Sequence, residues 1–210
     1  MPKEIIFLGG GDYRKEENIE IDDYLISVLN KDSKILIIPF AAPKEKYVSW
    51  ASALLNNFKK YGISNFEILD EDLSEDIMVK RIKGSNALFF TGGSPELLLD
   101  KLKEKNLINF LLNYPGILIG YSAGTLVFCK ECIILPEEGR TKIQILNGVG
   151  LCDFSTYVHY NESHDKYLLD LSKNREIYAI ENKSAVVLKD NRLKFIGKVH
   201  LFKNNEKLAL

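Results

Sequence analysis

The sequence has few of the residues that build metal centres and disulfide frameworks. It contains three cysteines and three histidines in 210 residues, and no Cys or His pair recurs at the spacing of a zinc site. An odd number of cysteines and the absence of a secretory signal pattern in the first residues favour reduced thiols. We therefore expect a cytoplasmic protein that needs no metal or organic cofactor.

The chain also lacks a charge excess of one sign and a long hydrophobic run. Its 28 basic and 29 acidic residues give a formal net charge of −1. Such a balance creates no general attraction for nucleic acid or an anionic membrane. No apolar stretch has the roughly 20 residues that a membrane span requires. We expect neither nucleic acid nor membrane as a partner, and a monomer or homodimer.

Short apolar runs alternate with helix-like segments through the first 128 residues. The expected strands are residues 5–8, 35–38, 66–69, 87–90 and 117–119. The expected helices are residues 21–29, 47–61, 73–83, 97–102 and 123–129. Buried strands that alternate with amphipathic helices predict an α/β fold, with a mostly parallel sheet and helices on both faces. The length suits a single domain over residues 1–210.

The pattern changes after residue 128. Short strands are expected at residues 133–135, 143–146, 177–180, 185–188 and 193–196, and a short helix at 166–171. Asp190 and Asn191 indicate a hairpin turn between the last two strands.

Residues 120–124, GYSAG, match the G-x-S-x-G nucleophile elbow. The motif places a serine on a sharp turn between a strand and a helix, where the flanking glycines avoid collisions. The preceding strand and following helix predicted here supply that context. The elbow predicts Ser122 as a nucleophile and directs the backbone N–H of Ala123 to the same place, as one oxyanion donor.

A serine hydroxyl needs a base, and three histidines are available. His159 lies in a segment downstream of the elbow and is the predicted base, with His164 as the reserve. His200 lies in an apolar stretch near the end of the chain, which is more typical of a structural histidine. An acid should orient the imidazole, and the spacing leaves four candidates open: Glu131, Glu137, Glu138 and Asp153.

Residues 91–94, TGGS, follow another expected strand and are the predicted source of the second oxyanion donor. Two glycines allow backbone N–H groups to approach a substrate closely. Ser94 and Pro95 fit the N-cap and first position of the next helix. The glycines at 9–11 do not form a dinucleotide-binding motif. Cys129 and Cys132 have redox-motif spacing, but buried or incidental thiols are the favoured interpretation.

Taken together, these landmarks resemble the peptidase E (aspartyl dipeptidase) and cyanophycinase group of serine peptidases, peptidase family S51. The resemblance rests on residues 9–11, 90–93, 121–124, 158–160 and 179–185. It implies a single three-layer α/β domain like that of class I glutamine amidotransferases, a flavodoxin-like fold. It also implies a triad of Ser122, His159 and Glu137, where the dipeptidases carry aspartate, and an oxyanion hole formed by the N–H groups of Gly93 and Ala123.

Two features depart from the family pattern. Ser94 stands where the family usually has asparagine, and residues 162–166, ESHDK, lack the arginine that suits an aspartyl substrate. The sequence therefore predicts a serine peptidase, a dipeptidase or exopeptidase of small peptides, without strict aspartyl preference. A catalytically silent binding protein on the same scaffold and an esterase are the alternatives.

Overall fold

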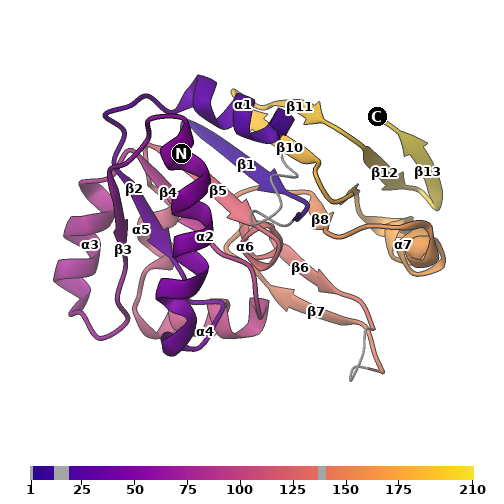
Figure 1. Ribbon diagram of the computed structural model, residues 1–210. Coiled ribbons are helices and arrows are strands. Elements are labelled where there is room, and N and C mark those ends of the chain that lie inside the picture. Colours follow the sequence, from indigo (N-terminus) through magenta and orange to yellow (C-terminus); the bar gives the residue numbers. More distant parts are fainter. Residues whose placement is uncertain (1, 12–18, 137–140) are drawn as a thin grey trace.

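The computed structural model describes residues 2–11, 19–136 and 141–210. Its centre is a seven-stranded sheet with the order β11-β10-β1-β5-β4-β2-β3 (Figure 1). The strands are β1 (Glu4–Leu8), β2 (Ile35–Ile38), β3 (Phe66–Ile68), β4 (Ala87–Phe90), β5 (Ile117–Tyr121), β10 (Ala185–Lys189) and β11 (Arg192–Ile196). β1 to β5 are parallel to one another, and β10 and β11 extend the β1 edge antiparallel.

Helices cover both faces of this sheet. They are α1 (Ile19–Val28), α2 (Tyr47–Lys60), α3 (Glu75–Lys83), α4 (Pro95–Glu104), α5 (Ile108–Leu112) and α6 (Ala123–Phe128). α1 and α2 pack with Ile6 of β1 in one core cluster. α3 to α6 pack with Phe7, the next residue of β1, in the other. Because successive side chains of a strand point to opposite faces, the apolar strands supply both cores.

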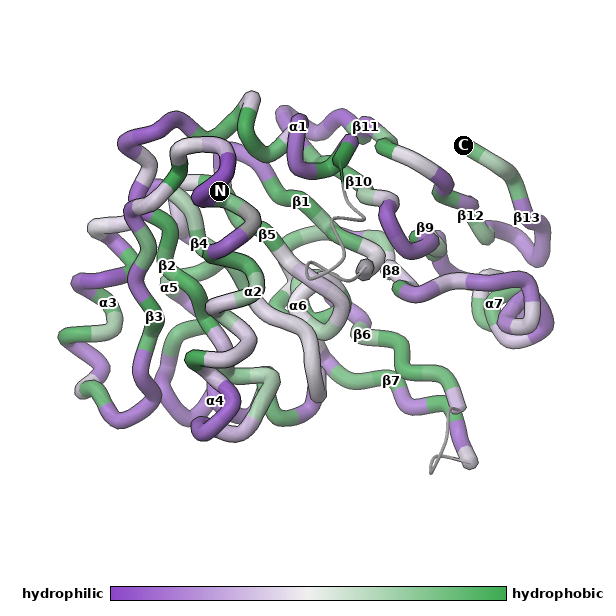
Figure 2. The backbone as a smooth tube through the Cα atoms, in the orientation of Figure 1, coloured by the Kyte–Doolittle hydropathy of each residue, from purple (hydrophilic) through white to green (hydrophobic). Residues whose placement is uncertain are grey.

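The hydropathy of the residues agrees with this layering, since the hydrophobic colour follows the strands of the central sheet (Figure 2). The strand residues from Ile35 to Ile38 and from Ala87 to Phe90 are all buried. The predicted α/β class, with a mostly parallel sheet between two helical layers, is confirmed.

A second, four-stranded sheet lies beyond the β10–β11 edge (Figure 1) and was not predicted as a unit. Its order is β13-β12-β9-β8, formed by β8 (Ser155–Tyr157), β9 (Ile177–Ile180), β12 (Val199–Lys203) and β13 (Glu206–Ala209). Helix α7 (Asp165–Leu171) packs on it through Leu168, which shares a cluster with Ile177 and Phe202. β6 (Glu131–Ile134) and β7 (Gln144–Asn147) form a separate antiparallel pair.

Three short 3₁₀ helices complete the described elements: η2 (Lys44–Lys46), η3 (Glu162–His164) and η4 (Ser172–Asn174). Across the described ranges, none of the helices has both the length and the apolar character needed to cross a membrane.

Candidate active site

Ser122 occupies the sharp turn between β5 and α6. Its backbone has φ 52° and ψ −108°, a conformation that costs a residue with a side chain of order 1–3 kcal/mol. A Cβ atom at Gly120 would lie 2.6 Å from the backbone nitrogen of Thr125, and one at Gly124 would lie 2.5 Å from the carbonyl oxygen of Phe90. The two glycines are therefore required by close packing of helix against strands, as the elbow motif demands.

His159 lies directly beside this serine. Its Nε2 is 2.8 Å from Ser122 Oγ, although the two residues are 37 positions apart in the sequence. His159 follows β8 with a positive φ of 53°, and its backbone N–H donates to the carbonyl of Gly9 at 2.9 Å. The chain after β1 thus fixes the backbone that carries the imidazole. Ser122 is partly exposed and His159 is exposed, so both are accessible from solvent.

The glycines that follow β1 also border the imidazole. Gly10 has φ 123°, and a Cβ atom there would collide with Cε1 and Nδ1 of His159. This glycine run matches no nucleotide-binding pattern, and in the sequence it served only as a landmark of the family resemblance. Because Gly10 has no Cβ atom, the imidazole of His159 can lie directly against its backbone.

The other ring nitrogen of His159 faces an amide. Nδ1 is 2.7 Å from Oδ1 of Asn182, which lies in the turn between β9 and β10. Sequence reasoning did not select Asn182. The only signal was its place within residues 179–185, a segment that carries the family resemblance.

Of the four acids that the sequence offered as triad members, two lie within the described residues. Glu137 and Glu138 lie outside the described residues. Glu131 accepts a hydrogen bond from Nε of Arg175 at 2.9 Å. Asp153 is exposed, before β8.

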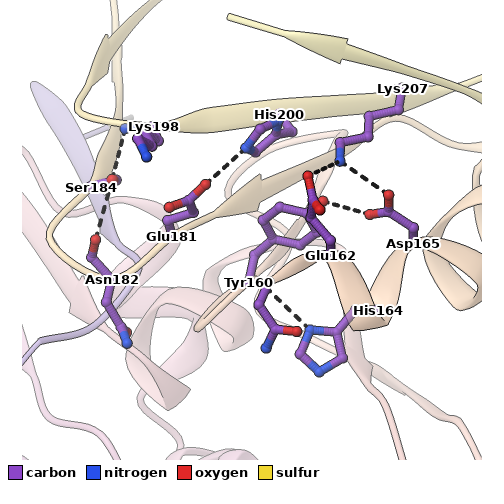
Figure 3. A network of polar contacts seen from close by, with 11 residues as sticks. Tyr160, Glu162, His164, Asp165, Glu181, Asn182, Ser184, Lys198, His200 and Lys207 are labelled. Carbon is purple, nitrogen blue, oxygen red and sulfur yellow. Dashed lines mark hydrogen bonds and ion pairs between the residues drawn. The ribbon is translucent and has the colours of Figure 1, made fainter.

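The two remaining histidines have partners away from Ser122. Nδ1 of His164 accepts from the backbone N–H of Asn161 at 3.4 Å, within the capping box of η3. Nε2 of His200 lies 3.1 Å from Oε1 of Glu181 (Figure 3). Of the three histidines, the structure brings His159 alone into hydrogen-bonding distance of Ser122 Oγ.

The two predicted oxyanion donors lie in the turn after β4 and at the first position of α6. β4 and β5 pair in parallel, with Phe90 opposite Gly120, so the turn after β4 runs beside the elbow. A Cβ atom at Gly92 would lie 3.3 Å from Cβ of Ser122. Ala123 is the first residue of α6 and is buried, and the first N–H groups of a helix have no partner within it.

The turn after β4 ends in the predicted helix cap. Ser94 Oγ accepts from the backbone N–H of Leu97 at 3.1 Å, and Pro95 begins α4. The Ser94 N–H donates to the carbonyl of Ala41 at 2.8 Å, which anchors Gly93 from the side of β2.

Tyr160, the neighbour of the histidine, is held in a polar cluster (Figure 3). Its hydroxyl donates to Asp165 Oδ1 at 2.5 Å, and Nζ of Lys207 lies 5.3 Å from its ring centroid. Burial, followed by the hydrogen bond to Asp165, raises the pKa of Tyr160 to about 12. The phenol is therefore a proton donor to Asp165 at neutral pH.

The three cysteines are buried free thiols. Cys129 is the C-cap residue of α6, and its Sγ lies 3.3 Å from Oγ1 of Thr156. The favoured interpretation of the Cys129–Cys132 spacing as buried thiols is confirmed. Within the described ranges, no group of three or more His, Cys, Asp or Glu residues is arranged to hold a metal ion.

The family model of peptidase family S51 matches residues 5–196. The chain belongs to peptidase family S51. The resemblance inferred from the sequence is thereby confirmed, and with it the hydrolase and peptidase class of the protein. Among curated proteins, none matches the chain.

The solved structures that share the fold of this S51 chain include the following two. A peptidase from an acI-B1 Actinobacterium is 23% identical, with a TM-score of 0.68, and the match covers 99% of this chain and 93% of that one. A protein described as a "Putative Peptidase E Protein from Listeria monocytogenes EGD-e" is 18% identical, with a TM-score of 0.72 and coverage of 92% and 98%. At these low sequence identities, the similarity shows a shared fold.

Proposed function

We propose that this S51 chain is a serine-type dipeptidase or exopeptidase that hydrolyses small peptides in the cytoplasm, with Ser122 as nucleophile and His159 as base. The observation that carries the proposal is the 2.8 Å separation of Ser122 Oγ and His159 Nε2 at a strained elbow. A nucleophile within hydrogen-bonding reach of a base is the arrangement that acyl transfer requires.

The proposed reaction has two stages. Nε2 of His159 accepts the Oγ proton while Oγ of Ser122 bonds to the peptide carbonyl carbon, and the oxyanion accepts hydrogen bonds from the N–H groups of Gly93 and Ala123. Nε2 then gives the proton to the leaving amine as the C–N bond breaks. Water next loses a proton to Nε2 and attacks the acyl-enzyme, and Ser122 leaves with that proton.

The charges around the segment after His159 support a preference that is not strictly aspartyl. Lys207 is a cation near this segment, and its Nζ lies 3.0 Å from Oδ2 of Asp165 and 3.8 Å from Oε1 of Glu162. A cation already paired with two carboxylates offers little additional attraction to a substrate carboxylate. We therefore propose that dipeptides with uncharged first residues are accepted.

A panel of dipeptides with varied first residues, incubated with the wild type and Ser122→Ala, tests the proposal. We expect hydrolysis by the wild type and a loss of at least about 10³-fold in kcat for the variant. Ser49→Ala, at an exposed serine of α2, is the matched control and should retain activity. Undiminished hydrolysis by Ser122→Ala would overturn the proposal.

A fluorophosphonate probe separates the proposal from its alternatives. A mass increase located on Ser122 in the wild type supports an activated serine. Absence of labelling and of hydrolysis would point instead to a binding protein on this scaffold. Hydrolysis of esters without any peptide hydrolysis would point to an esterase.

A further inference from the structure

We infer that a neutral amide, Asn182, completes the site in place of a carboxylate, so that the working unit is Ser122–His159–Asn182. This inference rests on the proposed function. Its basis is the 2.7 Å distance between Asn182 Oδ1 and His159 Nδ1, on the side of the ring opposite Ser122. Asn182 acts through the imidazole and is a positioning residue.

The amide oxygen determines which ring nitrogen carries the proton. Oδ1 can only accept a hydrogen bond, so the proton of the neutral imidazole lies on Nδ1 and is donated to Asn182. Nε2 then presents a lone pair to the Ser122 hydroxyl, which donates to it. This is the tautomer that can remove the serine proton. If the amide NH₂ faced Nδ1 instead, Nε2 would carry the proton and could not act as a base.

The turn that carries Asn182 is held by hydrogen bonds on both sides (Figure 3). The N–H of Glu181 donates to the Lys198 carbonyl at 3.2 Å, and the N–H of Lys198 donates to Ser184 Oγ at 2.8 Å. The Ser184 hydroxyl in turn donates to the Asn182 carbonyl at 3.5 Å. These bonds connect the Asn182 turn to the beginning of β12 and fix its backbone.

The same turn is attached to the glycine run beside the histidine. The N–H of Lys183 donates to the Gly10 carbonyl at 2.8 Å. A Cβ atom at Gly10 would lie 2.7 Å from Asn182 Oδ1, as well as colliding with the imidazole. Gly10 therefore lets the amide and the imidazole approach each other.

Two carboxylates near these elements are bonded to other groups. Glu181 precedes Asn182, but its Oε1 lies 3.1 Å from Nε2 of His200. Glu131 is paired with Arg175. Asn182 is thus the group that the structure places on Nδ1.

A neutral acceptor has a measurable consequence. A carboxylate in the same place would stabilise the imidazolium more strongly, because hydrogen bonds to ionised acceptors are about twice as strong as neutral ones. Asn182→Asp is nearly isosteric and should raise the pKa of His159 by about 1 unit. The acid limb of kcat/KM against pH should move to higher pH by the same amount.

The experiment is an ¹⁵N and ¹H NMR titration of the His159 imidazole in the wild type, Asn182→Asp, Asn182→Ala and Glu137→Gln, with kcat/KM profiles alongside. Asn191→Asp, in the β10–β11 turn at the end of β10 away from the Asn182 turn, adds the same charge far from the site and is the matched control. We expect the Nδ1–H tautomer in the wild type, its loss in Asn182→Ala, and a raised His159 pKa in Asn182→Asp alone.

Three results would overturn the inference. They are an Nε2–H tautomer in the wild type, equal His159 pKa values in the wild type and Asn182→Asp, or a lowered His159 pKa in Glu137→Gln, which would assign the orienting role to Glu137. The titration reads the imidazole directly. Normal titration shifts without any Ser122-dependent hydrolysis would therefore contradict the proposed function and leave the inference about Asn182 standing.

Discussion

Gly10 leaves no space for a Cβ atom between its own backbone and the imidazole of His159. The contact joins the first strand of the central sheet to the segment after β8, on which the predicted base is carried. A residue that the sequence did not connect with chemistry therefore determines how close the histidine comes to the rest of the site.

Gly10→Ala should reduce kcat/KM by at least about 10²-fold, since a displacement of about 1 Å at a catalytic group has effects of that size. The measurement is dipeptide hydrolysis together with the urea midpoint of unfolding. Gly62→Ala is the matched control, because Gly62 also has a positive φ, of 80°, but only a lysine side chain 3.8 Å away. The positive φ should cost each variant about 1–2 kcal/mol of stability, and the collision with the imidazole should add to the loss in Gly10→Ala. Equal activities of the two variants would contradict the role of Gly10.

Tyr160 gives a prediction for alkaline pH. Because its pKa is raised to about 12, above the ordinary phenol value of about 10, the folded state holds the proton more tightly than the unfolded chain. The stabilisation from Tyr160 is complete below pH 10 and is lost as the pH rises toward 12. The free energy of unfolding of Tyr160→Phe should lie below that of the wild type at pH 9, and the gap should narrow above pH 10.

Urea unfolding between pH 8 and 11.5 measures that gap, and Tyr167→Phe, at a more exposed tyrosine of α7, controls for the loss of a hydroxyl. At pH 9 the loss at Tyr160 should be about 1 kcal/mol, the value of a typical hydrogen bond. A gap that stays constant through pH 11 would contradict the raised pKa of Tyr160, because stability changes with pH only where the folded and unfolded pKa values differ.

The parts of the fold that could be predicted from the sequence are those specified by local pattern. The strands at 35–38 and 87–90 are uninterrupted apolar runs, which is the pattern of strands buried on both faces. The elbow was equally visible because its glycines lie only two positions from Ser122 in sequence. In contrast, β13 has no buried residue and β8 is only three residues long, so neither has a periodicity to detect.

The position of Asn182 could not be predicted for a different reason. It meets His159 across 23 residues, through a turn whose place depends on the unpredicted pairing of β9 with β12. Sequence spacing favoured carboxylates between Ser122 and His159, since a triad normally contains an acid. An amide in the last third of the chain has no sequence signature of its own.

Thr125 allows a test of how the elbow is held. Its buried hydroxyl lies 2.8 Å from the carbonyl oxygen of Leu8 and 2.7 Å from that of Gly120, at the ends of β1 and β5. Thr125→Val keeps the shape but removes the donor, and should cost about 1 kcal/mol of stability. Thr125→Ser keeps the donor and should retain more of the activity. Thermal unfolding and dipeptide hydrolysis measure both effects, and equal activities of the Val and Ser variants would contradict a role of this hydroxyl in positioning Ser122.

The buried thiols predict how the enzyme responds to inhibitors. Cys129 and Cys132 are fully buried and Cys152 is 8% exposed. The hydrogen bond with Cys129, together with burial, raises the pKa of the Cys152 thiol. Since the thiolate is the reactive form, iodoacetamide at neutral pH should leave peptide hydrolysis intact, while a fluorophosphonate should abolish it. Intact mass should show alkylation of the three cysteines only in urea.

Rapid inactivation of the folded protein by iodoacetamide, with the label on a cysteine, would mean that a thiol is exposed or takes part in the reaction. The Ser122→Ala variant separates those cases, because a thiol-dependent activity would persist when the serine hydroxyl is removed.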